Sequence, residues 1–297
     1  MISIIIPHFN QPDQLDQCLA SLTAQPGALD YEILVVDNGS KSLPEAVVAA
    51  HPGVRLIQET TPGPGPARST GVGETTGEIL AFIDADCVAD PGWLVAIAAR
   101  IRAGAQILGG DVRILHADPA RPTLWEAYES EFAYRMEHYI TRQGFTGTGN
   151  LACTRAVFQA VGPFAGIGLA EDRDWGQRAT AQGFAITWAP EMIAYHPPRT
   201  SFAEQGRKMD RHIGHDFAKI TAKPLGQLRW AGRTLAMAGS PIATVPRIAR
   251  STRIGGGLRG RLLAFWGVCQ TRLYRARVMG GLIGAQNADA LADRWRE

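Results

Sequence analysis

Residues 78–86 read Glu78-Ile-Leu-Ala-Phe-Ile-Asp84-Ala-Asp86, an apolar run that ends in two carboxylates two residues apart. A strand that is buried on both faces appears in sequence as an unbroken apolar run. Acids at its carboxyl end fall where open α/β sheets place their ligands. Two carboxylates in this spacing can converge on a hard divalent cation such as Mg²⁺ or Mn²⁺. The alternative is a turn in which Asp accepts hydrogen bonds from its own backbone.

Outward from this stretch, short apolar runs alternate with amphipathic patterns over the first two hundred residues. This βαβα order predicts an α/β fold with a mostly parallel, doubly wound sheet that helices cover on both faces. We predict strands at 2–6, 32–36, 54–58, 79–83, 107–114, 184–188 and 192–195. We predict helices at 14–22, 91–102 (with Asp90 as N-cap and Pro91 first), 124–140 and 171–182, and a glycine-rich loop at 144–150.

The composition is that of an ordinary globular protein, with 45% hydrophobic and 20% charged residues. The four cysteines show neither CxxC pairing nor zinc-finger spacing, which favours a reduced, cytosolic protein. The chain enters a strand at once, so we expect no signal peptide. Because no run of about eighteen apolar residues lacks a charge, we expect no spanning helix.

The charge is divided unevenly along the chain. Residues 1–200 hold 13 Lys and Arg against 22 Asp and Glu, a net charge of −9, whereas residues 201–297 hold 17 against 6, a net charge of +11. Between Asp216 and Asp289 there are twelve basic residues and no acid. A shift this sharp indicates a functional boundary. We therefore predict a domain at residues 1–215 and a basic helical extension at 216–297.

Two more predicted strands end in polar residues at the same edge of the sheet as Asp84. The first ends in Pro7-His-Phe9-Asn, and the second in Asp37-Asn-Gly-Ser. An aromatic ring and an Asp at this edge can face a nucleobase, with Asp37 accepting from a ring N–H or a ribose hydroxyl. By itself, however, Asp-Asn-Gly-Ser is also a good turn sequence.

The loop from Gly63 to Gly71 does not match the known phosphate-binding motifs. Proline fills the gaps between its glycines, and it lacks the Gly-Lys-Ser/Thr ending of a P-loop. We place Arg68 in the first turn of a helix, from which it could reach a base or phosphates. A surface arginine at a helix start is the alternative.

Three acids, Glu171, Asp172 and Asp174, open the helix predicted at 171–182. One of them is a candidate general base for an acceptor hydroxyl, although acids at a helix start are also favoured by the helix dipole. Upstream, Gly149 belongs to a loop whose glycines would let a substrate approach the backbone. His196 ends the last predicted strand, where a further metal ligand is expected.

Taken in order, these pieces resemble the family 2 glycosyltransferases, which are inverting enzymes of GT-A fold that use nucleotide sugars. The resemblance covers about residues 1–215. The matching segments are Ser3–Asn10, Val35–Ser40, Ala67–Gly71, Gly77–Asp86, Gly149-Asn150, Gly162-Pro-Phe164, Glu171-Asp172 with Arg178, and His196.

The resemblance implies a role for each matching residue. Pro7, Phe9, Asp37 and Arg68 would bind the nucleotide, and Asp84 would contact the ribose. Asp86 and His196 would hold the Mn²⁺ or Mg²⁺ that bridges the diphosphate. Asp172 would be the catalytic base, with Glu171 and Asp174 as alternatives.

The processive synthases of the family carry a Gln-x-x-Arg-Trp motif that this chain lacks. Gln227-Leu-Arg-Trp230 is one residue short, and Gln205-Gly-Arg-Lys-Met209 has no Trp. We therefore expect the transfer of a single sugar.

The basic extension has three interpretations. Nucleic-acid binding lacks interleaved aromatic residues or a known motif, so we expect no nucleic-acid partner, and a solvated appendage is the second interpretation. We favour docking on an anionic membrane surface, because stretches such as 258–279 combine arginines with leucines and aromatic residues. The enzyme would then be peripheral on the inner face of the cell membrane, beside a lipid-linked or cell-envelope acceptor.

Two other functions compete with glycosyl transfer. A nucleotidyltransferase shares this sheet and its metal-dependent chemistry, but its Gly-rich loop is absent after the first strand. A catalytically inactive carbohydrate-binding scaffold would not need Asp84, Asp86, Asp172 and His196 together.

Overall fold

The computed structural model describes residues 1–27 and 29–287, and they form two compact units that are discontinuous in sequence. The first, here the sheet unit, takes Met1–Arg113 and Tyr134–Pro197. The second, here the helical unit, takes Ile114–Ala133 and the chain from Pro198 onward. The chain passes from one unit to the other at 113/114, 133/134 and 197/198, and none of these points is the boundary predicted between residues 215 and 216. The functional division into 1–215 and 216–297 stays a prediction.

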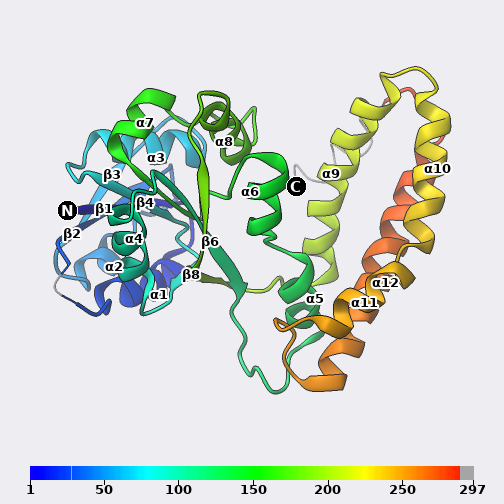
Figure 1. Ribbon diagram of the computed structural model, residues 1–297, viewed down its shortest axis with the longest axis horizontal. Helices are drawn as coiled ribbons and strands as arrows, with labels where there is room; N and C mark the ends of the chain where they lie inside the picture. The colour runs from blue at the N-terminus through cyan, green and yellow to red at the C-terminus, as the bar shows by residue number, and fades with distance from the viewer. Residues whose placement is uncertain (28, 288–297) are drawn as a thin grey trace. The chain divides into compact units, whose positions relative to one another are not determined.

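The described chain forms one eight-stranded sheet in the order β3-β2-β1-β4-β7-β6-β8-β5 (Figure 1). The strands are β1 (Ile2–His8), β2 (Tyr31–Asp37), β3 (Val54–Gln58), β4 (Ile79–Ile83), β5 (Val88–Ala89), β6 (Ile107–Ile114), β7 (Asn150–Thr154) and β8 (Ile186–His196). β1 pairs in parallel with β2 and β4, and β2 pairs in parallel with β3. β7 runs antiparallel to both β4 and β6. Because parallel strands end at one edge, the residues after β1, β2 and β4 gather there.

Helices complete both units, so the predicted α/β class with a helical C-terminal segment is confirmed. The helices of the sheet unit are α1 (Pro12–Thr23), α2 (Glu45–Ala49), α3 (Pro64–Gly73), α4 (Trp93–Arg102), α6 (Met136–Gln143), α7 (Arg155–Val161) and α8 (Glu171–Ala181). Those of the helical unit are α5 (Leu124–Phe132), α9 (Phe202–Thr221), α10 (Gly226–Gly239), the short 3₁₀ helix η1 (Ile242–Thr244), α11 (Val245–Arg250) and α12 (Gly257–Gly281).

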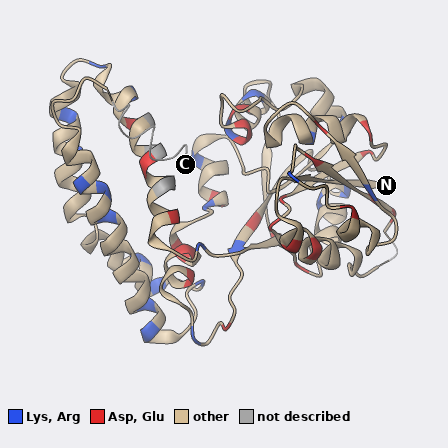
Figure 2. Cartoon of the chain, turned by 180° about the vertical axis from the view of Figure 1, so that it is seen from behind, with Lys and Arg blue, Asp and Glu red and all other residues tan. Residues whose placement is uncertain are grey.

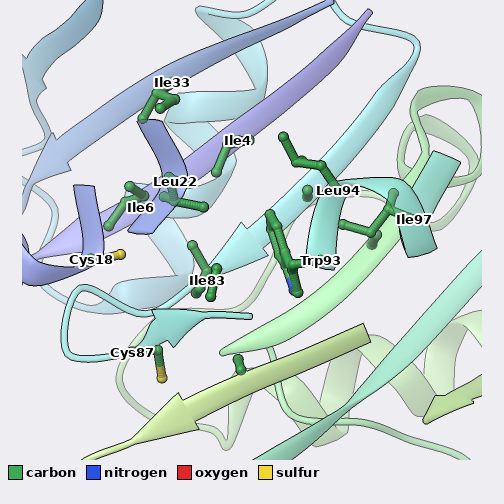
Figure 3. Close-up of a cluster of buried hydrophobic side chains, with 14 of the residues drawn as sticks. Ile4, Ile6, Cys18, Leu22, Ile33, Ile83, Cys87, Trp93, Leu94 and Ile97 are labelled. Atoms are coloured by element: carbon green, nitrogen blue, oxygen red, sulfur yellow. The ribbon is translucent and has the colours of Figure 1, made fainter. Parts of the chain in front are cut away.

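The sheet is buried on both faces, as the apolar runs of its strands predict. Ile4 and Ile6 pack into one apolar cluster with Leu22 and Trp93 (Figure 3). Ile5 belongs to a second apolar cluster, because successive side chains of a strand point to opposite faces. Both faces of β1 are therefore in the core, which fixes where the strand ends and where the polar residues after it lie.

The helix predicted at 124–140 is wrong as a single element. The structure has α5 and α6, separated at Ala133–Arg135, and α5 belongs to the helical unit. Tyr134 has φ +44°, a left-handed conformation that an α-helix cannot contain. The sequence pattern is helical on both sides of this break, so periodicity gave no sign of it.

Two other predictions need correction near the end of the sheet unit. The strands predicted at 184–188 and 192–195 are one strand, β8, which runs through Pro190. Pro190 is exposed, and such a position tolerates the missing N–H. β7 and α7 were not predicted; β7 follows directly on the glycine-rich loop and is only five residues long.

The starts of two helices also differ from prediction. α4 begins at Trp93 with Gly92 as its N-cap, because Asp90 instead closes a turn by accepting from the Gly92 N–H. α3 begins at Pro64, so Arg68 lies in the second turn of this helix and is buried. The alternative of a surface arginine is therefore wrong.

The helical unit has two apolar clusters of its own. One joins α9, α10 and α12 around Phe217, Trp230 and Met279. The other joins α5, α11 and α12 around Ala127, Ile248 and Val268. α5 is thus part of the core of the basic extension. Among the helices that the structure describes, none is long and apolar enough to cross a membrane.

Candidate active site

Arg68 links the two candidate segments at the end of β4 and the start of α8. Its Nη2 lies 2.5 Å from Asp84 Oδ1, and its Nη1 lies 3.1 Å from Glu171 Oε1. The Arg68 side chain is only 3% exposed, and its Nε has no hydrogen-bond partner within the described part of the chain. The guanidinium is therefore fixed by two acids, while Asp84 stays 39% exposed at the sheet edge.

Gly149 is needed because Asp84 lies directly against it. A Cβ at Gly149 would approach Asp84 Oδ2 to 2.4 Å, which is closer than any real contact. Next to it, Asn150 is a buried hub that accepts from Trp93 Nε1 and donates to the carbonyls of Asp111 and Met192. The glycine thus makes room for Asp84, and the asparagine holds the loop in place.

Asp86 and His196, which the sequence analysis proposed as neighbours at one site, face each other in the structure. β5 and β8 pair with Val88 opposite Tyr195, so the antiparallel register carries His196 past the Asp84–Asp86 turn. His196 Nε2 lies 3.3 Å from Asp86 Oδ2. His196 Nδ1 lies 2.6 Å from the carbonyl oxygen of Pro197. A carbonyl only accepts, so Nδ1 carries a proton and Nε2 is the nitrogen aimed at Asp86.

The pKa values of Asp86 and His196 are shifted in opposite directions by their contact. Burial raises the pKa of Asp86, but the hydrogen bond to His196 and its charge outweigh this, and the net pKa is lowered. Burial lowers the pKa of His196, but Asp86 outweighs it and the net pKa is raised. Nε2 with a lone pair and a carboxylate cannot face each other without a positive charge between them. A proton on Nε2 or a divalent cation would supply that charge.

The donor set fits Mn²⁺ or Mg²⁺ shared with a substrate. No group of three His, Cys, Asp or Glu side chains in residues 1–27 and 29–287 could hold a metal by itself. Asp86 and His196 therefore offer two ligands. This agrees with the habit of Mg²⁺ to take one or two protein ligands together with phosphate oxygens and water.

The three acids at the start of α8 have different environments. Glu171 pairs with Arg68, and Asp174 pairs with Arg178 at 2.9 Å. Arg178 in turn donates to the carbonyls of Val161 and Pro163, so Asp174 serves the packing of α8.

Asp172 accepts from the Arg173 N–H at 2.6 Å and has no ion-pair partner among the residues that the structure describes. Burial, helped by the charges of Glu171 and Asp84, raises the pKa of Asp172 in spite of that hydrogen bond and of Arg68. A carboxylate with a raised pKa and no ion-pair partner is suited to accept a proton.

The predicted nucleobase residues differ in how accessible they are. Phe9 is 57% exposed and Pro7 is half-buried. Asp37 is 0% exposed, and its oxygens accept from His8 Nδ1 at 2.8 Å and from the N–H groups of Gly39 and Ser40. In this structure Asp37 therefore shapes the loop after β2, and its contact with a base stays a prediction.

Asn38 ties the ends of β2 and β3 to the start of α3. It donates to the carbonyls of Glu59 and Thr61 and accepts from the Gly63 N–H. Gly63 has φ +121°, a conformation open to glycine. The chain between β3 and α3 thus forms a fixed turn, and Arg68 extends from α3.

Tyr134 is a site residue that the sequence analysis missed. Its ring lies 4.7 Å from the ring of His196, centroid to centroid, and so restricts how the imidazole can turn. The left-handed backbone of Tyr134 marks a position of strain, which is typical of functional sites. Only the positive φ reveals this residue, and the sequence gives no sign of it.

Comparisons with known proteins show the family of the chain. The model of the family described as Glycosyl transferase family 2 matches residues 3–160. The glycosyltransferase AglE of Haloferax volcanii is 34% identical over 218 residues, which are 71% of this chain and 71% of AglE. An uncharacterized glycosyltransferase of Mycobacterium tuberculosis is 36% identical over 109 residues, 37% of this chain and 47% of that protein.

Solved structures show the same fold. The mannosyltransferase PcManGT from Pyrobaculum calidifontis, in complex with GDP-Man and Mn²⁺, has a TM-score of 0.57 at 18% identity, covering 96% of this chain and 88% of that one. TarS of S. aureus, in complex with UDP-GlcNAc, has a TM-score of 0.53 at 15% identity, covering 99% and 90%. At these identities the likeness shows the GT-A fold alone. The family model and the relative AglE show the family as well as the fold. The chain belongs to glycosyltransferase family 2.

Proposed function

We propose that this enzyme transfers a single sugar from a nucleoside diphosphate sugar to a hydroxyl acceptor, with inversion at the anomeric carbon. The observation that carries the proposal is the environment of Asp172. Of the three acids that open α8, Asp172 alone lacks a cationic partner among the described residues, and its pKa is raised. It would take the proton of the acceptor hydroxyl as the acceptor oxygen bonds to the anomeric carbon and the bond from that carbon to the diphosphate breaks.

At the donor end, Arg68 and Gly149 hold Asp84 for the ribose, while Asp86 and His196 would hold the cation. Mn²⁺ or Mg²⁺ would supply positive charge that stabilises the departing diphosphate. Two neighbours of the same fold support this choice: PcManGT was solved with GDP-Man and Mn²⁺, and a glucosyl-3-phosphoglycerate synthase was solved with Mn²⁺ and UDP-Glc. Pro7 and Phe9 would border the base.

The proposal is tested by comparing Asp172→Asn with Asp174→Asn. Asp172→Asn should lower kcat by about 10²–10⁴, as expected when a general base is lost, and leave the donor Kd nearly unchanged. Asp174→Asn removes a packing ion pair and should change stability more than kcat. Full turnover in Asp172→Asn would assign the base role elsewhere.

The two competing functions have their own readouts. An inactive scaffold would not hydrolyse any nucleotide sugar in the presence of Mn²⁺. A nucleotidyltransferase would release pyrophosphate from a nucleoside triphosphate and a sugar phosphate. A thermal-shift panel of UDP-, GDP- and dTDP-sugars with Mn²⁺ would identify the donor, because a bound ligand stabilises the native state.

Transfer of one sugar is supported by the positions of the residues nearest to the processive motif. Gln205 is buried and donates to Glu129 Oε1 at 2.8 Å. Trp230 is fully buried and donates to the Met279 carbonyl at 2.9 Å. Both residues serve the core of the helical unit, so neither is free to guide a growing polymer.

We also propose that the helical unit docks on an anionic membrane surface, where a lipid-linked acceptor would be found. Leu258, Leu262, Trp266 and Leu273 of α12 are exposed, and their spacing of four, four and seven residues puts them on one face of the helix. Arg259 and Arg277 are exposed beside them. Figure 2 shows Lys and Arg along α10 and α12 without intervening acids. Exposed leucine and tryptophan side chains flanked by arginines can insert among anionic headgroups.

Vesicle co-sedimentation tests this docking. Phosphatidylcholine vesicles that contain phosphatidylglycerol should bind the protein, pure phosphatidylcholine should bind much less, and added salt should weaken the binding. Leu262→Ser and Trp266→Ser should reduce it. Val95→Ser, at an exposed apolar residue of the sheet unit, is the matched control and should not. Failure to bind anionic vesicles at low salt would refute the docking without touching the transfer reaction.

A further inference from the structure

Arg275 is a cation on the buried face of α12. Thr271 and Met279, four residues to either side of it, are 1% and 2% exposed, and residues spaced by four share one face of a helix. Its neighbours Tyr274, Ala276 and Met279 belong to the apolar cluster that α12 forms with α9 and α10. Its Nε is buried and has no hydrogen-bond partner among the described residues.

Two more arginines lie around it with few partners. Arg272 Nη1 donates to the sulfur of Met237 at 3.2 Å, which is a weak acceptor. Arg233 Nη2 lies 3.1 Å from Asp216 Oδ2. Burial is the main cause that lowers the pKa of Arg275; Arg272 and Arg233 lower it further, and Asp216 opposes them. Asp216 thus pairs with Arg233 and acts on Arg275 through its charge, and no ion pair is found for Arg272 or Arg275 among the described residues.

This cluster is unusual because a buried cation is costly unless it is paired and hydrogen-bonded. The other buried residues of α12 either are apolar or form their hydrogen bond within the helix. Thr271, for example, donates to the carbonyl of Gly267. Arg275 is only partly enclosed and Arg233 is exposed, so the cluster is open to a ligand from solvent.

We propose that Arg233, Arg272 and Arg275 form a binding site for a phosphate or diphosphate group. Guanidinium forks match the oxygens of phosphate in pairs, and a dianion would compensate the excess of positive charge. The group could belong to a lipid headgroup or be free in solution. The site is separate from the donor site of the sheet unit and from the exposed stripe of Leu262 and Trp266, so it stands whether or not the proposed function holds.

The test uses the full-length protein in EDTA, with inorganic pyrophosphate as the probe in calorimetry and thermal unfolding. Arg275→Met removes the central charge, and Arg275→Lys keeps the charge but loses the fork. Arg102→Met is the control, at an exposed arginine of α4 in the sheet unit, with the same change of net charge. Pyrophosphate should raise the Tm of the wild type and of Arg102→Met. It should raise the Tm of Arg275→Met least, with Arg275→Lys between them. Pyrophosphate bound at the donor site would stabilise all four proteins alike, so the difference between them is the readout.

The Tm without ligand gives a second readout that a purely structural arginine would fail. Arg275→Met should melt at or above the wild type, because it removes an uncompensated buried cation. If instead it melts well below the wild type and pyrophosphate shifts both equally, the arginine has a partner inside the chain. The proposal would then be overturned.

Vesicles distinguish the sources of the phosphate. If a headgroup is the ligand, Arg275→Met should bind vesicles containing phosphatidic acid several-fold more weakly than Arg102→Met does. If a soluble phosphate is the ligand, the two variants should bind these vesicles equally while their pyrophosphate affinities differ. Either result supports the site. Equal behaviour of the two variants in both assays would refute it.

Discussion

Replacing Gly149 by Ala should weaken donor binding while leaving the fold intact. The new Cβ would lie 2.4 Å from Asp84 Oδ2, where ordinary contact begins at 3.4 Å, so the carboxylate must retreat by about 1 Å. The Arg68–Asp84 bond is now 2.5 Å long, and such a retreat takes it past hydrogen-bond distance. The clash involves the end of one side chain and no core residue, which is why the fold should survive.

The displaced Asp84 would also lose the hydrogen bond that we propose it makes to the ribose of the donor. A hydrogen bond to a charged group contributes about 1.5–3 kcal/mol, which corresponds to about a 10- to 100-fold higher Kd for the nucleoside diphosphate. Calorimetry with the nucleoside diphosphate and Mn²⁺ measures this value, and thermal unfolding of the free protein checks the fold. Gly73→Ala is the control, because nothing lies within 4 Å of a Cβ at Gly73.

Repeating the substitution in a protein that carries Asp84→Ala distinguishes this mechanism from a general disturbance of the loop. If Gly149→Ala acts by displacing Asp84, it should cost little further affinity in a protein that already carries Asp84→Ala. An equal loss in both backgrounds, or an unchanged Kd in the single variant, would refute the reasoning.

Three other substitutions probe the rest of the site. Asp86→Ala should abolish metal-dependent binding of the nucleoside diphosphate and leave the fold intact; calorimetry with and without Mn²⁺ measures it, and an unchanged affinity would remove Asp86 from the metal site. Asp172 has a raised pKa, so the acid limb of the kcat/KM profile should lie above the ordinary Asp value near 3.8, because the base must be deprotonated. The same shift means that Asp172 costs stability as the pH rises through that window, so Asp172→Asn should melt slightly above the wild type at neutral pH; a lower Tm would contradict the shift. Tyr134→Ala should raise the Mn²⁺ concentration needed for half-maximal donor binding, and Tyr134→Phe should restore it, because the ring and not its hydroxyl holds His196. A purely structural role would lower the Tm of Tyr134→Ala without this metal effect.

The part of the site that sequence predicts well is the part set by strand ends. Asp84 and Asp86 follow a buried strand, and the α/β order alone places them at the ligand-binding edge. His196 was placed by the same reasoning, although β8 is antiparallel to β5 and joins the two strands predicted at 184–188 and 192–195. Because a strand that is buried on both faces has a fixed position, the polar residues that follow it are also fixed in position.

The part that sequence could not predict depends on contacts between distant residues. Nothing local distinguishes Asp172 from Asp174; the difference is the ion pair of Asp174 with Arg178 and the burial of Asp172. Asp37 has the sequence of an exposed turn, yet His8, 29 residues away, encloses it. Tyr134 lies within a helical pattern, and its positive φ follows from packing that periodicity does not encode.

The insertion of α5 into the helical unit has a consequence for synthesis of the chain. Glu131 of α5 pairs with Arg247, 116 residues later. At about 5–20 residues per second, α5 leaves the ribosome roughly 6–23 s before its partner is made. During that interval its apolar face, with Ala127 and Phe132, has nothing to pack against. Nascent chains stalled before residue 245 should therefore engage holdase chaperones, and chains stalled beyond α12 should be released from them.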